Sequence, residues 1–93
     1  MKLRQIDLST NHFTGSIPSA IGNMSSLEVL KLQENFLTGP FPIAILNISS
    51  LTIIALTKNH VSGTLPMDLC IHCPKLHRLH LSINELAVNS LHK

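Results

Sequence analysis

The chain has 93 residues, of which 44% are apolar and 13% are charged, and its formal net charge is +2 at pH 7. A chain of this length forms at most one small domain, and its apolar content argues against intrinsic disorder. The seven Lys and Arg residues are scattered singly, so no basic run can neutralise a row of phosphates and nucleic acid is a poor candidate partner.

Neither a signal peptide nor a transmembrane segment is visible. The opening stretch MKLRQIDLST alternates apolar and polar residues, whereas an export signal needs an uninterrupted apolar run. The segment 41–56, FPIAILNISSLTIIAL, is interrupted by polar residues and is shorter than the ~20 apolar residues that a spanning helix needs. We therefore expect this segment to be buried core and expect no direct membrane insertion.

A repeat organises the whole chain. Its leading leucines are Leu3, Leu27, Leu51 and Leu76, so the period is constant except for one extra position before the last of them. A period between about 20 and 50 residues is typical of a solenoid, in which each repeat packs only on its neighbours. The pattern predicts a single domain over 1–93, with repeats at 3–26, 27–50 and 51–75 and a partial repeat at 76–93.

Each repeat begins with an alternating pattern. Apolar residues stand three and five positions after each leading leucine: Ile6 and Leu8, Leu30 and Leu32, Ile54 and Leu56, Leu79 and Leu81. Successive side chains of a strand point to opposite faces, so this alternation predicts a short strand with one face inward.

Asparagine follows each predicted strand, at Asn11, Asn35, Asn59 and Asn84. Its short side chain carries both a donor and an acceptor, so stacked copies can satisfy backbone groups left open where each repeat turns. We assign these asparagines a structural role.

Glycine and proline recur behind the first three asparagines, at Gly15, Gly39 and Gly63 and at Pro18, Pro42 and Pro66. Glycine permits a turn with positive φ, and proline fixes an extended φ without donating a hydrogen bond. The residue before each proline is apolar: Ile17, Phe41 and Leu65. Further apolar positions follow at Ile21, Met24, Ile45 and Ile48, so the back of each repeat is also expected to enter the core.

These positions together give the pattern LxxLxLxxNxxxGxxPxxIxxxxxL, which resembles the plant-type extracellular leucine-rich repeat of receptor-like kinases and receptor-like proteins. The stretch SGTLPMDLCIHCPKLHRLHLSINEL is similar to repeats of the receptor-kinase group that includes innate immune receptors. The resemblance implies an α/β solenoid, a right-handed superhelix with a short parallel sheet on its concave face. Short strands and 3-10 or short-helix turns are implied on the convex side.

The resemblance also implies a function in signalling or defence at the plasma membrane, as part of a longer receptor. The expected partner is a protein or peptide ligand, with a co-receptor or a neighbouring leucine-rich repeat among the candidates. The pattern is lost at the end of the chain, where Val88 and Leu91 stand in place of Gly and Pro. Either the last repeat is irregular, or the chain stops in the middle of an array through truncation or altered splicing.

Recognition is expected on the concave face, where side chains between the buried strand positions point outward. The candidate partner-binding residues are Gln5, Asp7, Ser9, Thr10, Val29, Lys31, Gln33, Glu34, Ile53, Ala55, Thr57, Lys58, Arg78, His80, Ser82 and Ile83. A stable interface uses about 20 to 30 residues on each side, so this face alone would bind weakly. The alternative is that these are solvated positions in one stretch of a longer receptor.

The motif CIHC invites a zinc or redox interpretation, with His77 and His80 as imagined further ligands. Strand alternation places these two histidines on different faces, and the spacing matches no common zinc finger. Cys70 and Cys73 instead occupy the apolar slots of Ile45 and Ile48, and a buried cysteine behaves as a small hydrophobe. We favour the core interpretation and expect no metal.

Two N-glycosylation sequons, NMS at Asn23 and NIS at Asn47, occur at the same position of successive repeats. In an exported chain the two sugars would emerge from one edge of the solenoid.

No catalytic site is visible, because the glycines follow the repeat and the five carboxylates do not pair. We expect neither an enzyme nor a cofactor. Four alternatives remain: a secreted leucine-rich repeat inhibitor of foreign hydrolases, a cytosolic scaffold, a truncated remnant, and a metal or redox module around Cys70 and Cys73.

Overall fold

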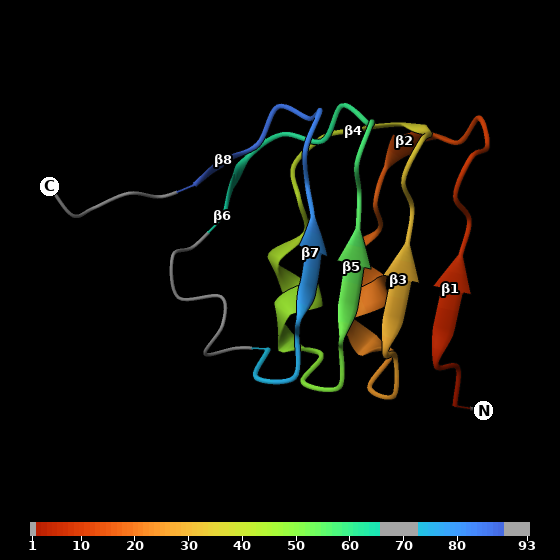
Figure 1. Cartoon of the computed structure of the whole chain (residues 1–93), viewed down its shortest axis with the longest axis vertical. Helices are drawn as coiled ribbons and strands as arrows, with labels where there is room; N and C mark the ends of the chain where they lie inside the picture. Colours follow the sequence, from red (N-terminus) through yellow and green to blue (C-terminus); the bar gives the residue numbers. More distant parts are fainter. Residues whose placement is uncertain (1, 66–72, 89–93) are drawn as a thin grey trace, which may run out of the picture.

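Four successive coils of the chain line up along the molecule, and each begins with a short strand (Figure 1). The computed structural model describes residues 2–65 and 73–88. The strands that begin the coils are β1 (Gln5–Asp7), β3 (Val29–Lys31), β5 (Ile53–Ala55) and β7 (Arg78–His80). They form one parallel sheet in the order β1-β3-β5-β7.

The sheet keeps the repeat in strict register. Gln5 lies opposite Val29, Val29 opposite Ile53, and Ile53 opposite Arg78, which reproduces the spacing of the leading leucines. Equivalent side chains of successive coils therefore stand side by side. The predicted solenoid with a short parallel sheet is confirmed.

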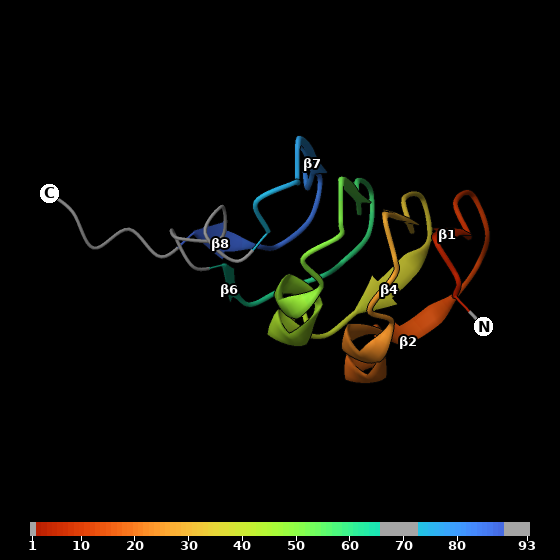
Figure 2. The same ribbon diagram turned by 90° about the horizontal axis from the view of Figure 1, so that it is seen from below.

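The opposite side of each coil carries further short strands and 3-10 helices (Figure 2). They are β2 (Thr14–Ser16), η1 (Ser19–Asn23), β4 (Phe36–Thr38), η2 (Ile43–Asn47), β6 (Thr64–Leu65) and β8 (Ala87–Val88), where η marks a 3-10 helix. The 3-10 turns expected on this side are confirmed, and Pro18 and Pro42 stand directly before η1 and η2 in extended conformation. Pro66 lies outside the described residues, as does Leu91.

The strands on the convex side pair in a different register from the strands of the main sheet. Thr14 of β2 lies opposite Phe36 of β4, and Thr64 of β6 lies opposite Ala87 of β8. In both pairs, the two facing residues are separated by fewer chain positions than the facing residues of the main sheet in the same two coils. The two sides of the solenoid are therefore sheared relative to each other, which the repeat pattern alone does not reveal.

The core fills the space between the main sheet and the two 3-10 helices. Its most deeply buried side chains are Leu27, Leu30, Ile45, Leu46, Ile48, Leu51, Ile54, Leu56, Val61 and Cys73. Ile17, Phe41 and Leu65, which precede the prolines, are buried as predicted. The sequence reasoning missed Leu46, whose equivalent in the first coil is Gly22.

Gly22 lies where the two 3-10 helices are in close contact. A β-carbon added at Gly22 would lie 2.7 Å from the carbonyl oxygen of Ala44, which is well inside van der Waals contact. Glycine is therefore required here for packing, since it lets η1 and η2 stack directly.

The first coil differs from the predicted inward-facing pattern. Leu3 and Leu8 are each 43% exposed and Phe13 is 45% exposed, whereas the equivalent Leu27, Leu32 and Leu37 are buried. The reason is that no described coil covers the far side of the first one. Strand alternation decides which way a side chain points, and the neighbouring coil decides whether it is buried.

A ladder of asparagine side chains joins the coils behind the sheet. The Nδ2 group of Asn59 donates to the carbonyl oxygens of Leu32 (2.9 Å) and Leu56 (3.0 Å). Its Oδ1 atom accepts from the backbone N–H of Leu37 at 3.0 Å. Each amide thus satisfies one group in its own coil and two in the preceding coil. Asn35 and Asn84 make the same set of bonds.

Because the asparagine ladder joins neighbouring coils, removal of the Asn59 amide is expected to lower the free energy of unfolding strongly. Asn59 is only 4% exposed, so Asn59→Ala removes three hydrogen bonds from a site that excludes water. The backbone N–H of Leu37 loses its acceptor, whereas the carbonyl oxygens of Leu32 and Leu56 each keep one bond, from Asn35 and Asn84. We expect the free energy of unfolding to fall by about 3 kcal/mol or more, measured by urea titration.

Asn11→Ala is the matched control. Asn11 is exposed, and its two bonds, to the carbonyl oxygens of Leu8 and Ser9, stay within its own coil. We expect a loss of about 1 kcal/mol or less. Equal losses in the two variants would show that the amide does not act between coils.

Candidate binding surface

The exposed face of the main sheet, called the sheet face from here on, is built from the outward residues of the four strands. Parallel register arranges them in rows across the coils. The first row is Gln5, Val29, Ile53 and Arg78, and the second row is Asp7, Lys31, Ala55 and His80. Ser9, Gln33, Thr57 and Ser82 occupy equivalent positions beyond the second row. This is the face on which the sequence predicted recognition.

The first row of the sheet face is apolar at its centre and polar at its two ends. Val29 and Ile53 are half-buried neighbours on β3 and β5, while Arg78 and His80 are exposed on β7. Ala55 was expected to point outward with the others, but it is buried. Its side chain is small and stands between the longer Lys31 and His80, so these neighbours shield it from solvent.

Asp7 provides a fixed negative charge at the first strand. The hydroxyl of Ser9 donates to Oδ1 of Asp7 at 2.6 Å, and the backbone N–H of Ser9 donates to the same atom at 3.1 Å. The pKa of Asp7 lies below its usual value, mainly because of the hydroxyl bond and then because of the backbone bond. The charge of Lys31 lowers this pKa further. The carboxylate is therefore ionised and held in one orientation at neutral pH.

Gln33 carries an unpaired acceptor. Its Oε1 atom is buried and has no hydrogen-bond partner among the residues that the structure describes. A buried acceptor without a partner costs about 1–3 kcal/mol.

The outermost predicted row lies in turns rather than in strands. Thr10, Glu34, Lys58 and Ile83 have φ values of 55°, 62°, 65° and 57°. The sequence reasoning assigned positive φ only to glycine, which is indeed found at Gly15, Gly39 and Gly63. Here the following asparagine stabilises the turn, because its amide group bonds carbonyls two and three positions back.

Thr10 and Ile83 are the strained members of this row, since a β-branched side chain is a genuine outlier at positive φ. We expect Ile83→Asn to raise the free energy of unfolding by about 1 kcal/mol, because asparagine tolerates the left-handed region. Urea titration measures the change.

Lys58→Asn is the control for Ile83→Asn, because Lys58 has the same conformation without a β-branch. We expect a smaller gain there. A loss of stability in Ile83→Asn, or an equal gain in Lys58→Asn, would contradict the strain argument.

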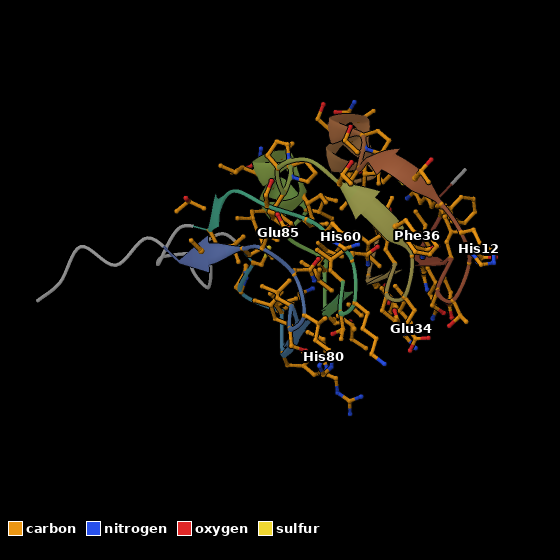
Figure 3. All side chains as sticks on the ribbon, turned by 90° about the horizontal axis from the view of Figure 1, so that it is seen from above. His12, Glu34, Phe36, His60, His80 and Glu85 are labelled. Carbon is orange, nitrogen blue, oxygen red and sulfur yellow. The ribbon has the colours of Figure 1, made fainter. Side chains whose placement is uncertain are left out.

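A further row runs along the edge of the molecule where the strands end, and we call it the rim row. It consists of the residue after each ladder asparagine: His12, Phe36, His60 and Glu85 (Figure 3). The rings of His12 and Phe36 stack with centroids 5.8 Å apart, and Nδ1 of His60 lies 3.7 Å from Oε2 of Glu85. The sequence reasoning did not single out this row, although the period of the repeat marks it.

Cys73 lies in the core. It is 1% exposed, and its Sγ atom is 3.4 Å from the carbonyl oxygen of Leu46. Cys70 lies outside the described residues. In the part of the chain that is described, no group of three His, Cys, Asp or Glu residues could hold a metal ion.

The two sequon asparagines, Asn23 and Asn47, are exposed and end η1 and η2. These helices stack on each other on the side of the solenoid opposite to the main sheet (Figure 2), so both residues belong to that side. In the described ranges, no helix has the length and apolar character needed to cross a membrane.

A family match agrees with the repeat, the parallel sheet and the asparagine ladder. The leucine rich repeat family matches residues 1–61. The chain belongs to the leucine-rich repeat family. The matched region is a repeat module rather than a catalytic domain. No curated protein matches the chain.

Solved structures of plant receptor-kinase ectodomains are similar to this leucine-rich repeat chain. The ectodomain of GASSHO1/SCHENGEN3 from Arabidopsis thaliana is 39% identical with a TM-score of 0.84, and 90% of this chain and 10% of that chain are covered. The Arabidopsis HAESA ectodomain is 31% identical with a TM-score of 0.85, covering 89% and 14%.

The SOBIR1 ectodomain from Arabidopsis thaliana is 28% identical with a TM-score of 0.83, covering 95% of this chain and 47% of that chain. This leucine-rich repeat chain therefore spans between a tenth and about half of the ectodomains that it resembles.

Proposed function

We propose that this chain is a recognition module that binds an extended peptide or protein segment on the sheet face and catalyses no reaction itself. The observation that carries the proposal is the arrangement of that face. A half-buried apolar pair, Val29 and Ile53, lies between an ordered carboxylate at Asp7 and the exposed cationic Arg78. An apolar centre with polar surroundings is the usual anatomy of a protein interface.

The similar ectodomains support this proposal. One structure shows GASSHO1/SCHENGEN3 in complex with CASPARIAN STRIP INTEGRITY FACTOR 2. Another shows HAESA in complex with the peptide hormone IDA and the co-receptor SERK1. By analogy, we propose a peptide or protein ligand, with a co-receptor as a further partner, and a place at the cell surface within a longer receptor for signalling or defence.

The chemistry of the sheet face suggests how a ligand would be held. An apolar ligand side chain over Val29 and Ile53 would be withdrawn from water, which supplies most of the affinity. Because the face is small, we expect modest affinity from this chain alone.

Ile53→Lys tests the sheet face. Random displayed peptides are first selected on the immobilised wild-type chain, and the enriched peptides are then titrated against the variant. We expect their affinity to fall by about tenfold or more, because lysine places a charge in the apolar centre.

Ile43→Lys is the matched control, because Ile43 is an exposed residue of η2 on the opposite side of the solenoid. We expect affinity within about twofold of wild type, since a substitution away from the interface leaves the contacts intact. Failure to enrich any peptide on the wild-type chain, or equal losses in the two variants, would refute the proposed site.

We also propose that Asn23 and Asn47 carry N-linked sugars when the chain is exported. Both side chains are exposed, and each stands at the start of an Asn-x-Ser sequon. Sugars at these two stacked positions would cover the convex edge and leave the sheet face open. Such an arrangement suits a receptor that binds its ligand on the other side.

Secretion of the chain from plant cells behind a fused leader tests the sugars. We expect enzymatic removal of N-glycans to lower the mass by two sugar chains in wild type and by one in Asn47→Gln, because the sequon requires asparagine. Ser49→Thr preserves the sequon and should behave as wild type. An unchanged mass of the secreted wild-type chain after the treatment would refute the assignment.

A further inference from the structure

Three neighbouring residues in the second row of the sheet face differ in size and charge, and we call them the Ala55 site. Ala55 on β5 lies between Lys31 on β3 and His80 on β7. It is only 5% exposed, because the longer side chains on either side cover it. Since β5 is an internal strand of the sheet, both sides of the site are formed by coils of the chain itself.

Both flanking side chains of the Ala55 site carry hydrogen-bond donors. Lys31 has an ammonium group with three donors, and His80, which lies on the sheet-face side apart from the rim row (Figure 3), has at least one ring N–H. Neighbouring strands lie about 4.8 Å apart, so the two backbones stand roughly 10 Å apart with only a methyl group between them. A carboxylate above Ala55 could therefore accept a bond of about 2.8 Å from each side.

The positive charge of Lys31 has no anionic partner in the part of the chain that the structure describes. The ion pairs found there join Arg4 to Glu28 and His60 to Glu85. Lys31 is half-buried and takes part in neither pair. An anionic group of a ligand would therefore gain a partner at Lys31 without breaking an existing ion pair.

The acidic groups of the sheet face are held at the other end of the sheet. Glu34 accepts a hydrogen bond from the hydroxyl of Thr10 at 3.3 Å, and the Asp7 carboxylate is held by the turn that follows β1. Asp7 stands two strands away from Ala55, which is about 10 Å and roughly one Debye length at physiological salt. Its repulsion of a ligand anion at the Ala55 site would therefore be weak.

The Ala55 site lies at a fixed distance from the apolar pair of the first row. Ile53 and Ala55 are alternate residues of β5, so they lie about 6.8 Å apart on the same face. In an extended peptide, side chains two residues apart share one face and have the same spacing. One such peptide can therefore place an apolar side chain over Ile53 and a second side chain over Ala55.

We propose that the Ala55 site selects a peptide with an acidic side chain, whose carboxylate binds between Lys31 and His80. This inference rests on the proposed binding of an extended peptide to the sheet face. It assigns the ligand a pattern, namely an apolar residue over Ile53 and an acidic residue two positions away. A basic side chain over Ala55 would be repelled by Lys31, and an amide would lack the charge that Lys31 attracts.

The peptides enriched on the immobilised wild-type chain test this pattern. Each peptide is synthesised in two forms that differ only in glutamate or glutamine at the acidic position. We expect wild type to bind the glutamate form about tenfold more tightly, because hydrogen bonds to a charged acceptor are the stronger ones. In Lys31→Met this preference should fall to about twofold, since methionine keeps an unbranched side chain of similar length but removes the charge. The glutamine form should bind Lys31→Met within about twofold of wild type.

Lys75→Met is the matched control. It removes the same charge from an exposed residue that precedes β7 and lies outside the sheet face, so the preference for glutamate should stay at about tenfold. If circular dichroism shows that Lys31→Met is unfolded, His80→Leu takes its place. His80 is exposed, and its replacement should lower the preference by about threefold or more.

The outcomes separate this inference from the proposed function. Enriched peptides without an acidic residue, equal binding of the two forms to wild type, an unchanged preference in the Ala55-site variant, or an equal fall in Lys75→Met would each overturn the acidic selection and leave peptide binding intact. Failure to enrich any peptide would instead refute the proposed function on which the inference rests.

Discussion

The hydrogen bonds of the ladder asparagines are the constraint on which the rest of the structure depends. A solenoid coil must turn sharply after each strand, and the turn leaves backbone groups pointing into the interior. The amide of Asn59 bonds three such groups from two coils. Because the donors and acceptors lie in successive coils, the same bonds that close one turn fix the position of the next coil.

This constraint converts sequence spacing into spatial rows. Residues separated by one repeat stand side by side across the sheet, as Gln5, Val29, Ile53 and Arg78 do. The interior positions of the rows are used for packing, so the outward positions and the rim row are the ones that face solvent. Recognition by such a chain depends on which side chains occupy these rows, and a ligand meets several coils at once.

The stacking of coils also explains the properties of the chain's two edges. A coil buries its apolar side chains only when another coil covers them, and the exposed Leu8 and Phe13 show the result where no described coil does. At the same edge, Oδ1 of Asn11 accepts no bond from the described residues, whereas the equivalent atoms of Asn35 and Asn59 accept one from the preceding coil. The interactions that stack coils are therefore the ones that bury the apolar side chains and pair the ladder amides.

The sequence by itself determined the solenoid, the parallel sheet, the turn glycines and the buried residues before each proline, because these follow from local spacing repeated three times. It also indicated the sheet face, since alternation separates inward from outward side chains. Only the tertiary structure decided the burial of Ala55, the left-handed turn at Ile83, the shear of the convex strands and the exposure of Leu8. Each of these depends on how neighbouring coils are placed, and a residue's own position in the repeat does not specify what its neighbours cover.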